Sequence, residues 1–316
     1  MKAPLPIVDG VGPSCQWLPV GPWETILDFL RERFPNVATA TWASRMARGQ
    51  VVDETGLRLN SGSPYRVGAC IFYYRELERE KRIPFNACVL YQDEHILAID
   101  KPHFLPVVPA GRFLHETLLV RLRKKGGPES LVPIHRLDRE TAGVVLFSLN
   151  PTTRGHYASL FRNRKVKKVY EALAPTLPEL SFPLTRRSRM VAGEPFFRMK
   201  EVAGEPNSET YIEVLKQMGV VTLYQLSPVT GRKHQIRLHL SALGIPIVND
   251  KLYPDMSFAS EDDFSNPLKL LAKSVSFEDP LTGQERYFAS ARKLLLRSAI
   301  YDSPFTVYDR FNEYTS

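Results

Sequence analysis

The chain has 316 residues, of which 43% are hydrophobic and 24% charged, so it can bury a core and extensive disorder is excluded. Its net charge of +8 favours a polyanionic partner, either nucleic acid or an anionic membrane. The membrane alternative lacks a basic amphipathic helix or a lipidation signal, and no stretch approaches the roughly 20 apolar residues of a transmembrane helix. The length favours about two domains.

The three cysteines, Cys15, Cys70 and Cys88, are odd in number, and no two are spaced as C-x-x-C. This pattern argues against a disulfide framework and against a zinc site. The first 20 residues have no continuous apolar core of the signal-peptide type. We therefore expect a cytoplasmic protein.

The N-terminal third is predicted to be a small α/β unit. Residues 1–20 are broken by proline and glycine and are expected to be irregular. Helices are then predicted at residues 22–35 and 39–49. A short hairpin is predicted at residues 50–59 and one further strand at residues 67–77.

This order of elements resembles the S4 RNA-binding domain over about residues 22–76. Asp53-Glu54-Thr55-Gly56 stands where that domain usually has an Asn-Gly turn. The resemblance implies an RNA-binding role, and the alternative is a small module that only packs on its neighbour.

A charge-rich linker at residues 75–83 precedes a larger domain with alternating strand and helix patterns. A hairpin is predicted at residues 88–102 and helices at 115–125 and 153–163. Further strands are predicted at residues 143–149, 168–174, 210–215 and 220–226. Residues 255–267 are expected to be a loop, and residues 269–290 the end of a helix followed by a hairpin. The mixture predicts an α+β fold with an antiparallel or mixed sheet.

Residues 133–150 contain the first candidate for chemistry. A polar block from His135 to Thr141 leads into an apolar run, which predicts a loop that feeds a buried strand. Asp138 lies between Arg136 and Arg139, and flanking positive charge keeps a carboxylate ionised, as a nucleophile or base requires. A surface salt-bridge cluster would give the same pattern.

Residues 233–244 are predicted to form a helix that ends at Gly244. At 100° per residue its apolar side chains form one stripe, so Arg237 can face away from the core. His234 and His239 are on different faces, which excludes the paired histidines of a metal helix.

A basic run at residues 162–168 precedes the strand that carries Tyr170. Such runs contact phosphates, and a nearby aromatic ring can stack on an unstacked base. A solvated charged loop is the alternative.

Together these segments resemble the RluA family of pseudouridine synthases, over about residues 88–295. Three ordered motifs carry the resemblance, each read directly from the sequence: His135-Arg136-Leu137-Asp138, Lys168-Val169-Tyr170-Glu171-Ala172 and Thr230-Gly231-Arg232-Lys233-His234-Gln235-Ile236-Arg237. Ala142, Lys233 and Asn249 depart from the usual residues, which leaves the RNA target less defined than the activity.

The resemblance implies a catalytic domain at residues 85–316 with a pseudouridine synthase fold, a mixed and mostly antiparallel sheet around a central cleft. The S4-like unit would occupy residues 1–84. Asp138 would be the catalytic nucleophile or base, with Arg136, Tyr170 and Arg237 binding the substrate and Arg237 paired with Asp138. The expected enzyme is a monomeric isomerase that acts on ribosomal or transfer RNA and needs no metal or other cofactor.

Two other classes stay open. A glycosidic hydrolase normally needs two carboxylates, and Glu140 is the nearest second one in the sequence. A protein with the same fold could also bind RNA or assist ribosome assembly without catalysis.

Overall fold

The computed structural model describes residues 3–77, 79–257 and 263–295. The chain divides into two compact units. The N-terminal unit consists of the chain up to Glu80 together with Gly111–His115, and the larger unit consists of Lys81–Ala110 and the chain from Glu116 onward. The division into functional domains at residues 84 and 85 stays a prediction.

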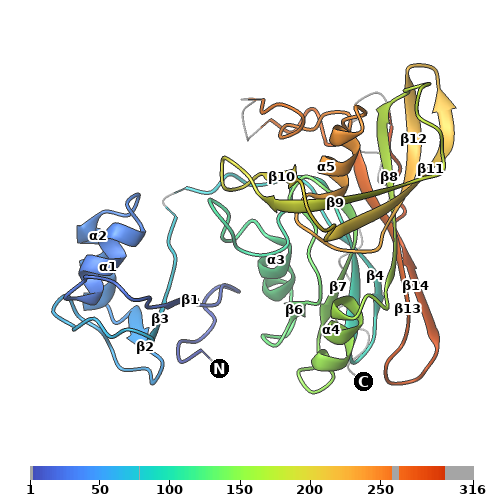
Figure 1. Ribbon diagram of the computed structural model, residues 1–316. Helices are drawn as coiled ribbons and strands as arrows, with labels where there is room; N and C mark the ends of the chain where they lie inside the picture. The colour runs from blue at the N-terminus through green and yellow to red at the C-terminus, as the bar shows by residue number, and fades with distance from the viewer. Residues whose placement is uncertain (1–2, 78, 258–262, 296–316) are drawn as a thin grey trace. The chain divides into compact units, whose positions relative to one another are not determined.

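The N-terminal unit places two helices beside a three-stranded antiparallel sheet with the strand order β1-β3-β2 (Figure 1). Its elements are β1 (Ser14–Trp17), α1 (Ile26–Arg33), α2 (Thr39–Ala47), β2 (Val51–Asp53) and β3 (Cys70–Tyr73). Thr25 caps α1, since its hydroxyl accepts the Asp28 N–H while the Asp28 carboxylate accepts the Thr25 N–H. The core between helices and sheet is formed by side chains that include Phe29, Leu30 and Trp42.

Two expectations for this unit were wrong. The lead segment is not irregular throughout, because β1 pairs with β3 over four residues. The expected hairpin at residues 50–59 has only one strand, β2, and its return is reduced to an isolated bridge between Val52 and Arg58. Long-range pairing with β3 decides both cases, and a local pattern does not report such pairing.

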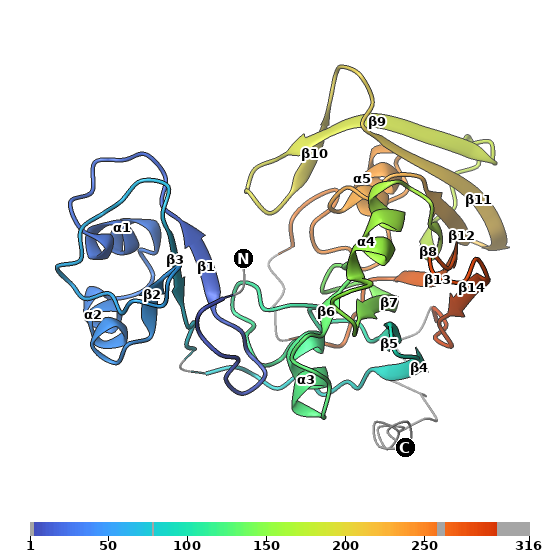
Figure 2. The same cartoon turned by 90° about the horizontal axis from the view of Figure 1, so that it is seen from below.

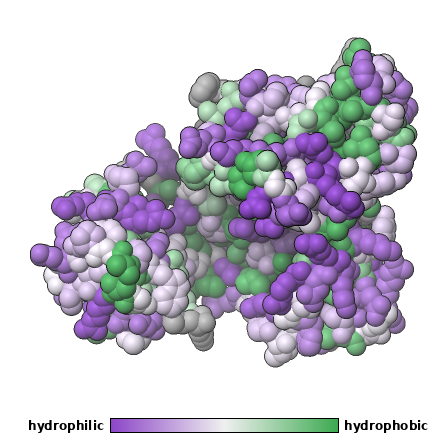
Figure 3. Space-filling model, in the orientation of Figure 1, coloured by the Kyte–Doolittle hydropathy of each residue, from purple (hydrophilic) through white to green (hydrophobic). Residues whose placement is uncertain are grey.

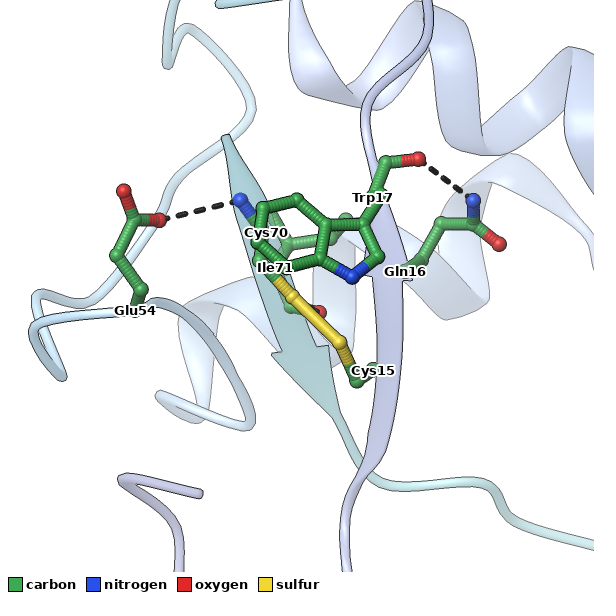
Figure 4. The surroundings of a disulfide bond; sticks show 6 residues. All are labelled: Cys15, Gln16, Trp17, Glu54, Cys70 and Ile71. Atoms are coloured by element: carbon green, nitrogen blue, oxygen red, sulfur yellow. Dashed lines mark hydrogen bonds between the residues drawn. A yellow bond between two sulfur atoms is a disulfide. The ribbon is translucent and has the colours of Figure 1, made fainter. Parts of the chain in front are cut away.

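Cys15 and Cys70 form a disulfide that joins β1 to β3 (Figure 4). The strand register aligns Cys15 with Phe72 and Trp17 with Cys70, so the cysteines are diagonal neighbours with Cα atoms 6.6 Å apart. The expectation that these cysteines would not pair was therefore wrong. Strand pairing brings together two residues that are 55 positions apart in the sequence.

We expect Cys15→Ser to lower the free energy of unfolding of the N-terminal unit by about 2–4 kcal/mol, since a long loop is no longer closed in the unfolded chain. All three tryptophans, Trp17, Trp23 and Trp42, belong to this unit, so their fluorescence during urea denaturation reports on it alone. Cys88→Ser in the larger unit is the matched control. Coincident transitions for wild type and Cys15→Ser would contradict the prediction.

The larger unit contains an eleven-stranded sheet (Figure 2). Nine of its strands follow the order β10-β9-β11-β12-β8-β13-β7-β5-β4, and the other two, β14 and β6, pair with β13 and β7. Its pairings are antiparallel except for the parallel pair of β13 and β7, which confirms the expected α+β class with a mixed sheet. The strands are β4 (Cys88–Gln92), β5 (Ile96–Lys101), β6 (Val132–Pro133), β7 (Ala142–Ser148), β8 (Lys167–Pro175), β9 (Leu184–Ala192), β10 (Met199–Val202), β11 (Ser208–Met218), β12 (Val221–Pro228), β13 (Leu270–Glu278) and β14 (Glu285–Ala289). The helices are α3 (Leu118–Lys124), α4 (Arg154–Arg162) and α5 (Gln235–Ala242).

Two helices cover different parts of this sheet. Ile236 and Leu240 of α5 pack into a core made with β8, β11, β12 and the start of β13. Tyr157 and Leu160 of α4 pack against β5, β7 and the later part of β13. The end of α5 that carries the arginine motif is thus anchored over β8 and β12.

The predicted helix end before the last hairpin was wrong, because residues 270–278 form the strand β13. This strand is hydrogen-bonded to β8 on one side and to β7 and β14 on the other. The strands β9 and β10 were not predicted. Part of the expected loop at 255–267, residues 258–262, lies outside the described residues.

The outer half of the β11–β12 hairpin extends beyond the core under α5. Val214, Leu215 and Val220 are exposed in this part, and apolar side chains gather there in Figure 3. The α5 core includes Ile212 and Tyr224 but none of these three residues.

Candidate active site

Asp138 lies in the loop between β6 and β7, and its side chain is 30% exposed. The fully buried Lys101 stabilises this loop through hydrogen bonds to backbone carbonyl groups. The Lys101 ammonium donates to three carbonyl oxygens, those of Pro102 at 3.0 Å, Leu105 at 2.8 Å and Arg139 at 3.1 Å. Because Arg139 follows Asp138 directly, the buried ammonium fixes the backbone that carries the carboxylate.

The parallel pairing of β7 with β13 brings this loop beside Tyr170. Gly143 in β7 aligns with Ala272 in β13, and Ala272 aligns with Tyr170 in β8. Gly143 has φ +114°, and a Cβ atom there would clash with the Ala272 carbonyl group. Gly143, five residues after Asp138, therefore permits the close strand approach that sets Asp138 near Tyr170.

Gln235 fixes the start of α5 through four hydrogen bonds. Its Oε1 accepts from the Thr230 hydroxyl at 2.6 Å and from the Arg232 N–H at 3.1 Å. Its Nε2 donates to the Glu209 carbonyl and to the Thr210 hydroxyl, both at 2.9 Å. All polar positions of this buried amide are thus used to attach the helix to β11 and to the preceding loop.

Arg237 makes its shortest contacts with Asp250, which sequence reasoning did not single out. Nε and Nη2 donate to the two Asp250 oxygens at 2.7 and 2.6 Å, and the two side chains are 2% and 1% exposed. The Arg237 Nη1 atom is 3.7 Å from Asp138 Oδ2. Asp138, the partner expected from the sequence, is therefore farther from Arg237 than Asp250 is. The two hydrogen bonds to Asp250 orient the guanidinium toward Asp138.

The charge of Arg237 is secured by these neighbours. Burial by itself lowers the pKa of Arg237, but the hydrogen bonds and charge of Asp250, together with the charges of Asp138 and Glu140, raise it overall. Tyr170 is in the opposite situation, because burial and the nearby Asp138 charge raise the pKa of its phenol. The site thus holds a permanent cation and a neutral phenol beside one carboxylate.

All four candidate residues from the sequence line one pocket: Arg136, Asp138, Tyr170 and Arg237. Lys168, Arg232 and His234 add polar and basic groups to its wall, while Pro228, Ile236 and Leu270 add apolar surface. Such a mixture suits a planar base attached to a phosphate backbone. Asp138 is the one carboxylate among these lining residues.

His135 anchors the start of the loop that carries Asp138 to β7 and α4. Its Nε2 accepts the Leu146 N–H at 3.1 Å, and its ring stacks on Phe161. Burial, with Lys168 nearby, lowers the pKa of His135 from 6.5 to about 3. The imidazole is therefore neutral in the folded protein at neutral pH.

This histidine makes stability depend on pH. Between pH 6.5 and 3 the unfolded chain binds a proton at His135 and the folded chain does not, so its contribution is complete above pH 6.5 and is lost as the pH falls. We expect His135→Gln to reduce the loss of unfolding free energy between pH 6 and 4 by up to about 1.4 kcal/mol per pH unit. Urea denaturation followed by circular dichroism at several pH values measures this, and parallel pH curves for the two proteins would contradict it.

Within residues 3–77, 79–257 and 263–295, no group of three or more His, Cys, Asp or Glu side chains could hold a metal ion. No helix in these ranges is long and apolar enough to cross a membrane.

Comparison with known proteins agrees with the motifs. The family model described as RNA pseudouridylate synthase matches residues 95–242. An uncharacterised RNA pseudouridine synthase of Synechocystis is 30% identical over 234 residues, which cover 72% of this chain and 79% of that protein. The dual-specificity RNA pseudouridine synthase RluA of Haemophilus influenzae is 33% identical over 204 residues, 63% of this chain and 90% of that one.

A solved structure, human RNA pseudouridylate synthase domain containing 1, matches with a TM-score of 0.56 and 25% identity over 69% of this chain and 88% of that one. The fold, the motifs and these relatives agree. The chain belongs to the RluA-type family of RNA pseudouridine synthases and is an isomerase that makes pseudouridine.

Proposed function

We propose that Asp138 is the catalytic carboxylate and that this enzyme isomerises uridines in ribosomal or transfer RNA. The observation that carries the proposal is that Asp138 is partly exposed in a pocket with Tyr170 and 3.7 Å from Arg237. The target uridine must leave the base stack, because its glycosidic bond is otherwise shielded. Exposed basic side chains at the pocket, including Arg136 and Arg232, suit the phosphates on either side of the flipped nucleotide.

In this reaction Asp138 acts as nucleophile or base while the N1–C1′ bond breaks. The uracil stays in the pocket, turns, and forms a C5–C1′ bond, and where Asp138 has attacked C1′, the bond between Asp138 and C1′ breaks at the same time. The C5 proton then leaves to solvent, and N1, now free of the ribose, takes up a proton. Tyr170 stacks on the base, and its neutral phenol can relay the C5 proton only by passing its own hydroxyl proton on to solvent or to Asp138. Arg237 places its positive charge 3.7 Å from Asp138, and Arg136 contacts the RNA and can fill the space that the flipped base leaves.

Hydrolysis of the glycosidic bond is less well supported. Glu140, the candidate for a second carboxylate, pairs with Arg139 at 3.0 Å and is not among the residues that line the described pocket.

We further propose that the N-terminal unit has an S4-like role in RNA binding and that the enzyme is a cytoplasmic monomer. The Cys15–Cys70 disulfide removes the cysteine pattern as an argument for the cytoplasm, so the RNA substrate is what supports this location. Arg45 of α2 and Arg48, the residue that follows this helix, both pair with Glu76, at 3.2 and 3.1 Å. Arg31 of α1 pairs with Asp28 at 3.7 Å, and the exposed Arg33 of the same helix is better placed for phosphates.

The test is incubation with total RNA that carries tritium at C5 of uridine. Pseudouridine formation releases the tritium to water, because C5 gives up its hydrogen. Hydrolysis would instead release labelled uracil, and a non-catalytic binder would retain the RNA without releasing either. Mapping pseudouridines in a deletion strain then identifies the RNA, and an unchanged pattern in all stable RNAs would overturn the proposed function.

A further inference from the structure

His234 lines the pocket in a backbone conformation that few residues with a Cβ adopt. It precedes α5 with φ 55° and ψ 18°, in the left-handed region, and its side chain is 8% exposed. This conformation directs the imidazole between two groups, Tyr253 on one side and Asp138 on the other. From the sequence this histidine is part of the third family motif, but the only chemical role weighed for it, as a metal ligand, was rejected.

The contact with Tyr253 determines which imidazole nitrogen carries the proton. The buried Tyr253 oxygen accepts the Met199 N–H at 2.8 Å and is 2.9 Å from His234 Nδ1. If Nδ1 donated to this oxygen, the buried phenol proton would have no acceptor among the residues that the structure describes. The satisfied arrangement has the phenol donating to Nδ1, which leaves the proton of a neutral imidazole on Nε2.

The imidazole is neutral near pH 7. Burial lowers the pKa of His234 to about 4, and the charges of Arg237 and Lys233 oppose its protonation further, against the effect of Asp138 and Asp250. The Nε2 atom therefore faces Asp138 as an N–H donor.

The two donors in the pocket approach the same oxygen of Asp138. His234 Nε2 is 3.9 Å and Arg237 Nη1 3.7 Å from Oδ2. Catalytic hydrogen bonds are often long without substrate and tighten when it binds. Two donors on Oδ2 leave Oδ1 as the oxygen that can face the ribose or the base.

We propose that His234 is a positioning residue whose imidazole, held in the Nε2–H tautomer by the Tyr253 hydroxyl, fixes Oδ2 of Asp138 and so aims Oδ1 at the flipped nucleotide. This inference rests on the proposed role of Asp138. It differs from the role of Arg237, which supplies charge, because His234 supplies a neutral donor whose direction is set by Tyr253.

Kinetics with tritium-labelled RNA provide the first test. His234→Phe keeps a planar ring without a donor and should lower kcat by about 10- to 100-fold with KM changed by less than about threefold. His234→Gln returns an N–H donor and should recover part of the lost kcat. His156→Phe, an exposed histidine on α4, is the control and should leave both constants unchanged.

Long-range ¹H–¹⁵N correlation spectra of the full-length enzyme labelled at histidine provide the second test, with His234 assigned from the spectrum of His234→Gln. We expect a protonated Nε2 and an unprotonated Nδ1 at pH 7 in the wild type, and a mixture of tautomers in Tyr253→Phe. Tyr224→Phe is the matched control, because its hydroxyl donates to the Pro175 carbonyl outside the pocket.

A proton on Nδ1 in the wild-type enzyme would overturn the inference, as would wild-type kcat in His234→Phe. If Asp138→Asn is inactive while His234→Phe is fully active, the inference alone fails. If Asp138→Asn is active, the proposed function fails with it.

Discussion

Asp138→Asn is expected to stop pseudouridine formation, with a loss of at least about 10³-fold in single-turnover rate. Asparagine keeps the shape of the side chain but can neither attack carbon nor accept a proton as a carboxylate does. RNA binding should change by less than about threefold, because the basic groups that line the pocket remain. Tritium release measures the first effect and filter binding the second.

Glu140→Gln is the matched control for this prediction. Glu140 is the next carboxylate in the same loop, but it pairs with Arg139 and does not line the pocket. We expect its turnover to stay within about tenfold of wild type. A loss equal to that of Asp138→Asn would favour a mechanism with two carboxylates, and residual turnover in Asp138→Asn would remove Asp138 from the catalytic role.

Sequence reasoning reached the site because the chemistry is concentrated in three short motifs. Asp138, Tyr170 and Arg237 are far apart in the chain, and the structure brings all three to one pocket. The sequence predicted that the loop passes into a strand at Gly143. It did not predict that a side chain at this position would clash with the Ala272 carbonyl group. A close approach between two strands depends on their pairing, which no local pattern specifies.

The contacts of Arg237 and His234 that sequence reasoning missed depend on where the chain returns after α5. Asp250 follows that helix by several residues, and its carboxylate accepts from Arg237 and from the N–H groups of Leu252 and Tyr253. The same turn places Tyr253 against His234. From the sequence, Asn249 of this segment was compared with the family pattern, and such a comparison does not say which residues touch.

The strands that were missed have a similar cause. Residues 270–278 contain apolar side chains at spacings that also fit a helix, and burial between β8 and β7 makes them a strand. Likewise, β1 is only four residues long and is flanked by proline, so only its partner β3 reveals it.

Arg237→Ala is expected to abolish turnover and also to destabilise the larger unit. From the sequence alone the effect would be confined to catalysis, since Arg237 was expected to pair with the partly exposed Asp138. The structure pairs it instead with Asp250, and removing either partner of a buried ion pair costs about 3–5 kcal/mol because the other charge is left unpaired. Circular dichroism during urea denaturation measures the loss, and tryptophan fluorescence follows the N-terminal unit separately.

A double-mutant cycle separates the two roles of Arg237. Asp250→Ala should destabilise about as much as Arg237→Ala, but the double variant should be destabilised by at least about 2 kcal/mol less than the sum. Turnover should not recover in the double variant, because Asp138 still lacks its cation, and Arg237→Lys should not restore it, because an ammonium cannot bridge both Asp250 oxygens and still reach Asp138. Additive losses of stability would show that the pair is not coupled. Recovered turnover in the double variant would mean that Arg237 acts on the fold and not on Asp138.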